Sequence, residues 1–189
     1  MSEPVGAPRP DTVGPEFSRP ERLDMIGEQA RTIVVEATPD EAAALAARFG
    51  LLSVAMLRAR CAVHREARGV VVTGLVEAEL VQACAATGDP LAVAVREPLA
   101  LLYVVETDNP PADELELTPD ALDIVPLEGG LIDLGEAAAE TMALALDPFA
   151  RAPHADEALR AAGVLREDEA GPFGVLAGLR DMLSGKIKG

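Results

Sequence analysis

The strongest constraint on the fold of this chain is a series of three long segments in which apolar and polar residues alternate. They lie at residues 54–66, 70–84 and 91–105, and in the first the odd positions are apolar while Arg58 and Arg60 stand at even positions. Successive side chains of a strand point to opposite faces, so this period predicts strands with one buried and one solvent-exposed face. The short connections between the segments favour antiparallel hairpins.

Two helices are predicted from the residues at their ends. The first begins after Thr38, a residue type that caps helices, and ends at Gly50, which adopts the left-handed conformation easily. The second covers residues 133–146, where Asp133 is a good N-cap and Glu136 follows three positions later in a capping-box pattern. Each helix has an apolar side, so each is expected to cover a sheet.

Together these segments predict an α+β fold. Residues 31–37 and 123–127 add two further strands. We expect a curved antiparallel sheet, open or barrel-like, that is covered by one or two helices and followed by a helical C-terminal tail. Residues 1–15 are expected to be a disordered arm, residues 16–148 a single α+β domain, and residues 149–189 a linker with a C-terminal amphipathic helix.

The charge and composition of the chain argue against some classes of function. The 189 residues include 32 acidic and 16 basic residues, which gives a formal net charge of -16, and aromatic residues make up only 3%. Direct nucleic-acid binding relies on clustered Lys and Arg and on aromatic stacking, so this composition argues against it and favours basic partners. No apolar run is long enough to span a membrane and the start lacks a signal-peptide pattern, so a cytoplasmic protein is expected.

Cys84, beside the turn at residues 87–90, is the first candidate for chemistry. A nucleophile, a metal ligand and a redox switch are the alternatives to a small buried residue. The turn offers Asp89 alone as a charged group, and this carboxylate would raise the pKa of the thiol, so the buried residue is the favoured interpretation. Cys61 and His64 have the spacing of metal ligands, but on a strand they point to opposite faces. No catalytic residue, metal site or cofactor is therefore predicted.

The most unusual feature is a long acidic segment. Between Arg96 and Arg151 there is no Lys or Arg, while thirteen Asp and Glu residues occur. The acids on the predicted helix have no basic residue four positions away to offset their repulsion. A solvated face and a docking surface for a basic protein both remain open as interpretations. The candidate docking residues are Glu114, Glu116, Asp120, Asp123, Glu136, Glu140 and Asp147.

Two smaller features are further candidates for partner binding. Arg58, Arg60 and His64 form a basic stripe suited to RNA phosphates. In one register of the hairpin, however, Arg60 faces Glu77 and Arg58 faces Glu79, and cross-strand ion pairs then account for the stripe. Near the end of the chain, the apolar side of a helix packs on its own domain or enters a groove of a partner. The residues of that side are Phe173, Leu176, Leu179 and Leu183.

Three segments resemble a known family in their order and spacing. They are LVQACAATGDPL at residues 80–91, EGGLIDLGEAAAETMALALDP at residues 128–148, and GPFGVLAGLRDML at residues 171–183. The chain resembles the YceD family of large ribosomal RNA subunit accumulation proteins from about residue 16 to residue 184.

The N-terminal EFSRP is similar to the alphaproteobacterial branch of that family. The resemblance implies a role in the synthesis, processing or stability of large-subunit ribosomal RNA, and no established enzymatic activity. Many relatives carry a C-x-x-C pair in the hairpin; here Val81 to Cys84 occupies that place, so the first cysteine is missing.

The resemblance and the acidic composition together predict a non-enzymatic factor in ribosome biogenesis. Its acidic surface and apolar helix are expected to bind a basic ribosomal protein or assembly factor, so that ribosomal RNA is affected indirectly. The first alternative is direct RNA binding through Arg58, Arg60 and His64. The second alternative is a hydrolase that depends on carboxylates.

Overall fold

The computed structural model describes residues 15–105, 122–127 and 129–164. In chain order the elements are β1 (Pro20–Arg22), the 3-10 helix η1 (Leu23–Met25), β2 (Arg31–Glu36), α1 (Pro39–Phe49), β3 (Ser53–Glu66), β4 (Gly69–Ala83), β5 (Pro90–Val105), β6 (Asp123–Leu127), β7 (Leu131–Asp133), α2 (Leu134–Leu144) and α3 (Ala155–Ala161).

The chain divides into two compact units. One consists of Met1–Gln82 with Ala92–Asp147, and the other of Ala83–Leu91 with Pro148–Gly189. The turn between β4 and β5 therefore groups with the residues that follow α2.

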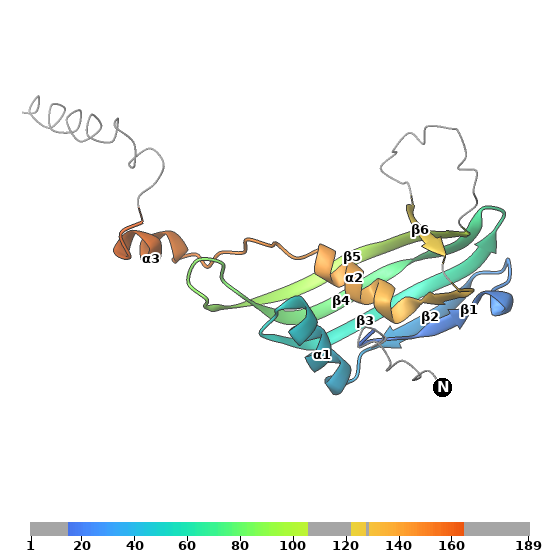
Figure 1. The fold of residues 1–189 in the computed structure, drawn as a ribbon, viewed down its shortest axis with the longest axis horizontal. Helices are drawn as coiled ribbons and strands as arrows, with labels where there is room; N and C mark the ends of the chain where they lie inside the picture. Colours follow the sequence, from blue (N-terminus) through green and yellow to red (C-terminus); the bar gives the residue numbers. More distant parts are fainter. Residues whose placement is uncertain (1–14, 106–121, 128, 165–189) are drawn as a thin grey trace, which may run out of the picture. The chain divides into compact units, whose positions relative to one another are not determined.

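The first unit is built on a five-stranded sheet in the order β2-β3-β4-β5-β6 (Figure 1). β3 pairs antiparallel with both β2 and β4, whereas β6 pairs parallel with β5. A parallel neighbour requires a long connection, which residues 106–122 supply. The α+β prediction is confirmed. The sheet is open among the described strands, with β2 and β6 at its edges, so the barrel-like alternative is wrong.

The alternating pattern in β3 places one face of the strand in the core, as predicted. Leu57, Ala59 and Cys61 are completely buried, and the intervening residues are exposed. A bulge near the start of the strand shifts the register between Val54 and Met56. It turns Val54 inward and leaves Ala55 exposed, which reverses the alternation expected there.

Helix α1 begins and ends where its sequence signals predict. The side chain of Thr38 accepts a hydrogen bond from the N–H of Glu41, and the carboxylate of Glu41 accepts one of 2.8 Å from the N–H of Thr38. The guanidinium of Arg19 adds two bonds to the same carboxylate, of 2.7 and 2.9 Å. At the other end Gly50 has a φ of 65°, in the left-handed region that favours glycine.

Helix α2 starts at the predicted cap. The carboxylate of Asp133 accepts hydrogen bonds from the N–H groups of Gly135 and Glu136, and also from Ser18 and Arg19 of the N-terminal segment. This one side chain therefore joins the segment before β1 to the start of α2, next to the antiparallel pairing of β1 with β7. The helix ends at Leu144, two residues before the predicted end.

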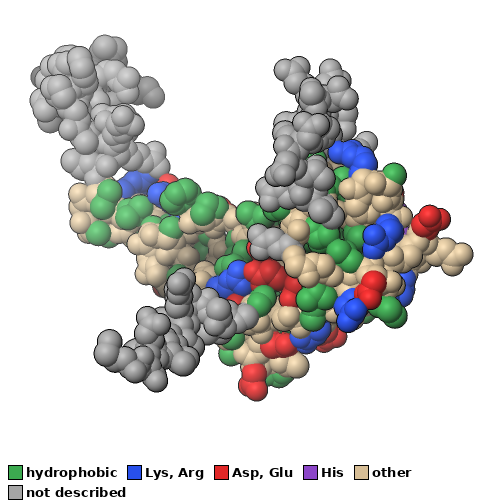
Figure 2. All heavy atoms as spheres, turned by 45° about the vertical axis from the view of Figure 1, so that its right-hand side comes forward, with side chains coloured by type: hydrophobic (Ala, Val, Ile, Leu, Met, Phe, Trp, Pro, Cys, Tyr) green, Lys and Arg blue, Asp and Glu red, His purple; other side chains and the backbone are tan. Residues whose placement is uncertain are grey.

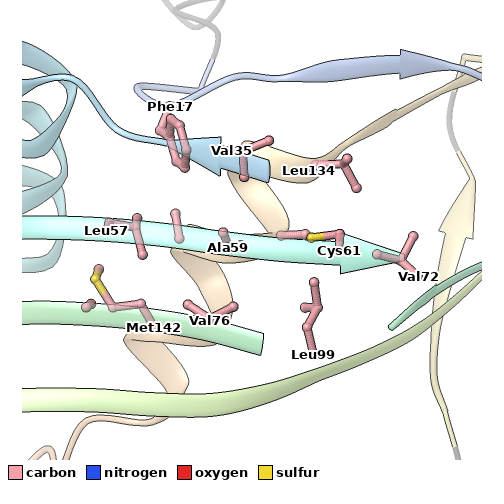
Figure 3. Close-up of a cluster of buried hydrophobic side chains, with 14 of the residues drawn as sticks. Phe17, Val35, Leu57, Ala59, Cys61, Val72, Val76, Leu99, Leu134 and Met142 are labelled. Atoms are coloured by element: carbon pink, nitrogen blue, oxygen red, sulfur yellow. The ribbon is translucent and has the colours of Figure 1, made fainter. Parts of the chain in front are cut away.

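The core of this unit lies between the sheet and its two helices, because α1 and α2 cover the same face (Figure 1). Figure 3 shows Leu57 and Cys61 of β3 beside Val76 of β4, with Leu134 and Met142 of α2 packed over them. Burial of such side chains is the main stabilising contribution to a fold of this size. Within the described ranges, no helix has the length and hydropathy needed to cross a bilayer.

Candidate functional site

A groove opens between α2 and the outer strands β5 and β6. Its volume is about 430 Å³. Its floor is mainly apolar and its rim carries three carboxylates. The residues that line it include, on the apolar side, Leu99, Leu101, Tyr103, Val125, Ala137 and Leu144, and, on the acidic side, Glu97, Asp123 and Glu140.

Two of the predicted docking residues are brought together at this groove. Asp123 pairs with Leu101 in the parallel ladder, which places it on the face of the sheet that α2 covers. Glu140 lies on α2 and is exposed. Across the described parts of the chain, the carboxylates of Asp123, Glu140 and Glu97 form no ion pair. The groove therefore carries negative charge that no side chain in these ranges offsets.

Tyr103 is the polar residue in the wall of the groove. It is 8% exposed, and its hydroxyl forms no hydrogen bond with a residue that the structure describes. Burial raises the pKa of Tyr103 to about 12, and the carboxylates of Glu140 and Asp133 add to the shift. The phenol therefore remains neutral at physiological pH and has both a proton and lone pairs to offer.

Tyr103 and Glu97 were not among the predicted docking residues, although the sequence holds a signal for both. They stand at odd positions of β5, the same parity as the buried Val95 and Leu99. Alternation alone places them on the helix-covered face. What alternation does not show is that β6 and α2 leave a groove over that part of the face.

Glu136 has a partner that its own helix does not provide. Arg48 of α1 donates hydrogen bonds of 2.9 and 2.5 Å to its two carboxylate oxygens and a third, of 2.9 Å, to Glu16. Glu136 has no basic residue four positions away on its own helix, and Arg48 of α1 supplies the cation instead. Asp147 lies beyond the end of α2 and is exposed. The other predicted partner-binding residues, Glu114, Glu116, Asp120, Phe173, Leu176, Leu179 and Leu183, lie outside the described residues.

The stripe residues Arg58 and Arg60 lie on the face of the sheet opposite the helices. The predicted pairing is wrong: Arg58 is opposite Glu77, and Arg60 is opposite Leu75. The cause is the tight turn after Glu66, which pairs directly with Gly69 and shifts the register by two residues. Neither guanidinium forms an ion pair within the part of the chain that the structure describes.

His64 is the third stripe residue, and Cys61, its candidate neighbour in a metal site, points to the opposite face of β3. Its Nε2 lies 3.0 Å from Oε1 of Glu66, and its Nδ1 is buried without a partner. Cys61 is completely buried in the core, which raises the pKa of its thiol to about 11. In the described ranges, no three His, Cys, Asp or Glu side chains gather closely enough to hold a metal ion.

Cys84 belongs to the second unit and is 3% exposed, which confirms the prediction of a small buried residue. The pKa of its thiol is lowered, not raised, by hydrogen bonding with the side chain of Thr87 and with the N–H of Ala152. The carboxylate of Asp89 accepts a hydrogen bond of 2.6 Å from the hydroxyl of Thr87 and lies 2.9 Å from Nε2 of His154.

Charged side chains of both signs are mixed on the molecular surface. Figure 2 shows acidic and basic side chains next to one another among hydrophobic ones, with no continuous patch of one sign on this face. Ion pairs such as Arg19–Glu41 and Arg48–Glu136 account for part of this mixing. The carboxylates of the groove are not among the ion pairs formed within the described residues.

One family model matches the chain, and it contains the whole groove. It is described as Large ribosomal RNA subunit accumulation protein YceD, and it matches residues 72–180, more than half of the 189-residue chain. The match begins in β4, so it leaves out β2, α1 and β3. No curated protein and no solved structure gives a significant match. The strands and helix that form the groove are thus those shared with the family, and the chain belongs to the YceD family of large ribosomal RNA subunit accumulation proteins.

Proposed function

We propose that this protein supports the accumulation of large-subunit ribosomal RNA without catalysing a reaction, by binding a basic ribosomal protein or assembly factor. Membership in the YceD family links the chain to large-subunit ribosomal RNA. The observation that carries the proposal is that Asp123 and Glu140, from different elements, border one groove with an apolar floor and have no cation partner in the described residues.

The charge and the apolar surface of this protein are complementary to those of a basic partner. The chain has a formal net charge of -16, which steers basic proteins toward it and repels RNA phosphates. The apolar residues that line the groove, including half-buried Leu101 and exposed Leu144, add surface that a partner buries on binding. A basic ribosomal protein held in this way is shielded until it reaches the nascent subunit. Without that supply, incompletely assembled RNA is exposed to degradation and accumulates poorly.

The test is affinity purification of the tagged protein from its own cells, with and without RNase, followed by mass spectrometry. Wild-type protein is expected to retain a basic large-subunit protein or assembly factor after RNase, and Asp123→Lys/Glu140→Lys to lose it. The matched control is Glu28→Lys/Glu79→Lys, which makes the same charge change at exposed positions outside the groove. Equal loss in both double variants would show that net charge alone matters, and partners that vanish with RNase would contradict the proposal.

A second candidate function is direct RNA binding by the stripe, and one observation favours it. Arg60 lies between Leu75 of β4 and Val34 of β2, so its neighbours across the sheet do not neutralise its charge. Its test is the salt dependence of binding to large-subunit ribosomal RNA. If Arg58 and Arg60 each contact one phosphate, Arg58→Gln/Arg60→Gln should reduce the slope of log K against log salt by about two.

A further inference from the structure

The hydroxyl of Tyr103 is a hydrogen-bonding group in the groove that has no partner among the described residues. Tyr103 is more than nine-tenths buried and lines the groove, and its hydroxyl bonds to no described residue. Among the described residues, the only side-chain nitrogen or oxygen that is both fully buried and without a hydrogen-bond partner is Nδ1 of His64. Since the hydroxyl oxygen of Tyr103 has no such partner either, it is not fully buried, and a ligand in the groove can reach it. A polar group in this state favours a ligand that satisfies it.

The charged groups around this hydroxyl determine whether a cationic or an anionic ligand is favoured. Glu97, Asp123 and Glu140 line the same groove, and its lining includes no Lys or Arg from the described ranges. Burial raises the pKa of Tyr103, and the nearby carboxylates of Glu140 and Asp133 raise it further, which agrees with a negative potential at this position. An anionic ligand such as an RNA phosphate would meet the same repulsion, whereas a cation would be attracted.

We propose that the groove holds an arginine side chain of the basic partner, with its guanidinium bonded to the carboxylates of Glu140 and Asp123 and to the hydroxyl oxygen of Tyr103. This inference rests on the proposed function and specifies the chemistry of its partner. A guanidinium presents five N–H donors in a plane, which suits several separate oxygen acceptors better than a compact ammonium group does. The aliphatic part of the side chain packs along the apolar wall that includes Leu101 and Leu144.

The chain offers a built-in reporter for this site. Tyr103 is the single tyrosine and there is no tryptophan, so intrinsic fluorescence excited at the tyrosine band reports on the groove. The probe is the tripeptide acetyl-Leu-Arg-Leu-amide, compared with the same peptide carrying citrulline, a neutral isostere, or lysine. We expect the arginine peptide to change the fluorescence in a saturable manner, the citrulline peptide to bind at least about tenfold more weakly, and the lysine peptide to fall between them.

Variants then assign the contacts by backbone amide shifts in NMR titrations with the arginine peptide. Glu140→Gln should weaken binding about three- to tenfold because it removes the negative charge from the acceptor, and Tyr103→Phe should do so because it removes the hydroxyl acceptor. Glu28→Gln, an exposed acid that does not line the groove, should leave binding unchanged. Unperturbed amide spectra of each free variant establish that it is folded. Equal affinity for all variants, equal binding of arginine and citrulline peptides, or shifts confined to other surfaces would overturn the proposal.

The peptide titration and the partner purification separate the two proposals. If the cells yield a basic large-subunit partner but the arginine peptide does not bind in the groove, the arginine site is wrong and the proposed function stands. If the peptide binds as expected but no basic partner survives RNase, the groove is an arginine site and the proposed function is wrong.

Discussion

The guanidinium of Arg48 in α1 donates two hydrogen bonds, of 2.9 and 2.5 Å, to the carboxylate of Glu136 in α2. The same guanidinium donates to Glu16, in the segment that leads into β1. One side chain thus connects both helices that cover the sheet with the N-terminal segment. The two side chains of the pair are 31% and 21% exposed, so water only partly screens their attraction.

Arg48→Ala is expected to lower the free energy of unfolding by about 1–2 kcal/mol, because it leaves two neighbouring carboxylates without their cation. Urea denaturation measures this change. The control is Arg68→Ala, which removes the same charge from an exposed turn and should change stability by less than about 0.5 kcal/mol. A loss of the same size in both variants would show that the charge, and not the bridge, is responsible.

Glu41 is expected to make stability depend on pH in the acid range. The guanidinium of Arg19, followed by the N–H of Thr38, lowers the pKa of Glu41 from 4.5 to about 2. The folded state then binds fewer protons than the unfolded state, so this contribution is complete above pH 4.5 and is lost as pH falls toward about 2.

Glu41→Gln should therefore lower stability at pH 7 by about 1–2 kcal/mol, and the difference from wild type should disappear near pH 2. Thermal unfolding monitored by circular dichroism between pH 2 and pH 7 tests this. Asp40→Asn, the same kind of change at the preceding exposed residue, serves as the comparison. A difference that stays constant with pH would rule out the ionised pair as its source.

Gly135→Ala is expected to destabilise the protein although alanine favours helices. A Cβ at Gly135 would lie 2.3 Å from the carbonyl oxygen of Phe17 and 2.9 Å from its carbonyl carbon. Backbone atoms cannot move aside cheaply, so we expect a loss of about 1–3 kcal/mol in urea denaturation. Gly27→Ala is the control, since a Cβ there has no atom within 4 Å. A neutral Gly135→Ala would show that the N-terminal segment is not held against α2.

The titration of Tyr103 can be followed without labels, because it is the single tyrosine of the chain. Absorbance at the phenolate band should rise with a midpoint at about pH 12, compared with an ordinary tyrosine pKa of 10.0. Glu140→Gln should lower the midpoint, since it removes a negative charge that opposes ionisation. A midpoint near 10 in the folded wild-type protein would contradict both the burial and the negative potential of the groove.

Tyr103→Phe should leave the stability of the free protein unchanged or slightly raised, within about 0.5 kcal/mol, because the hydroxyl has no partner to lose in the part of the chain that the structure describes. Urea denaturation is again the measurement. A loss of about 1 kcal/mol or more would indicate that the hydroxyl is bonded within the folded chain, and the groove would then not offer it to a ligand.

Local features of this protein follow from the sequence because their causes are local. Thr38 and Gly50 mark the ends of α1, since capping depends on a few neighbouring residues. Leu57 and Cys61 lie in the core, since alternation on a strand needs no knowledge of its neighbours. Asp133 caps α2 for the same reason, although its bonds to the N-terminal segment could not be predicted from spacing.

The register between neighbouring strands cannot be predicted from local sequence signals alone. The position of Arg58 opposite Glu77, and of Arg60 opposite Leu75, depends on the length of the turn before Gly69. Alternation fits any register shifted by two residues equally well, because such a shift keeps the same residues on the buried face. The predicted register therefore differs by two residues from the register that the turn sets.

The groove is decided by tertiary structure alone. Asp123, Glu140 and Tyr103 are brought together because β6 enters the sheet parallel to β5 while α2 crosses the same face. Glu136 lies on the same helix as Glu140, but it forms an ion pair with Arg48, a residue 88 positions earlier. The sequence alone accounts for the five strands of the main sheet, the start of both covering helices, the acidic excess and the family. Which acids remain unpaired, and around what surface, is set by contacts between residues too far apart in the chain for any local pattern to record them.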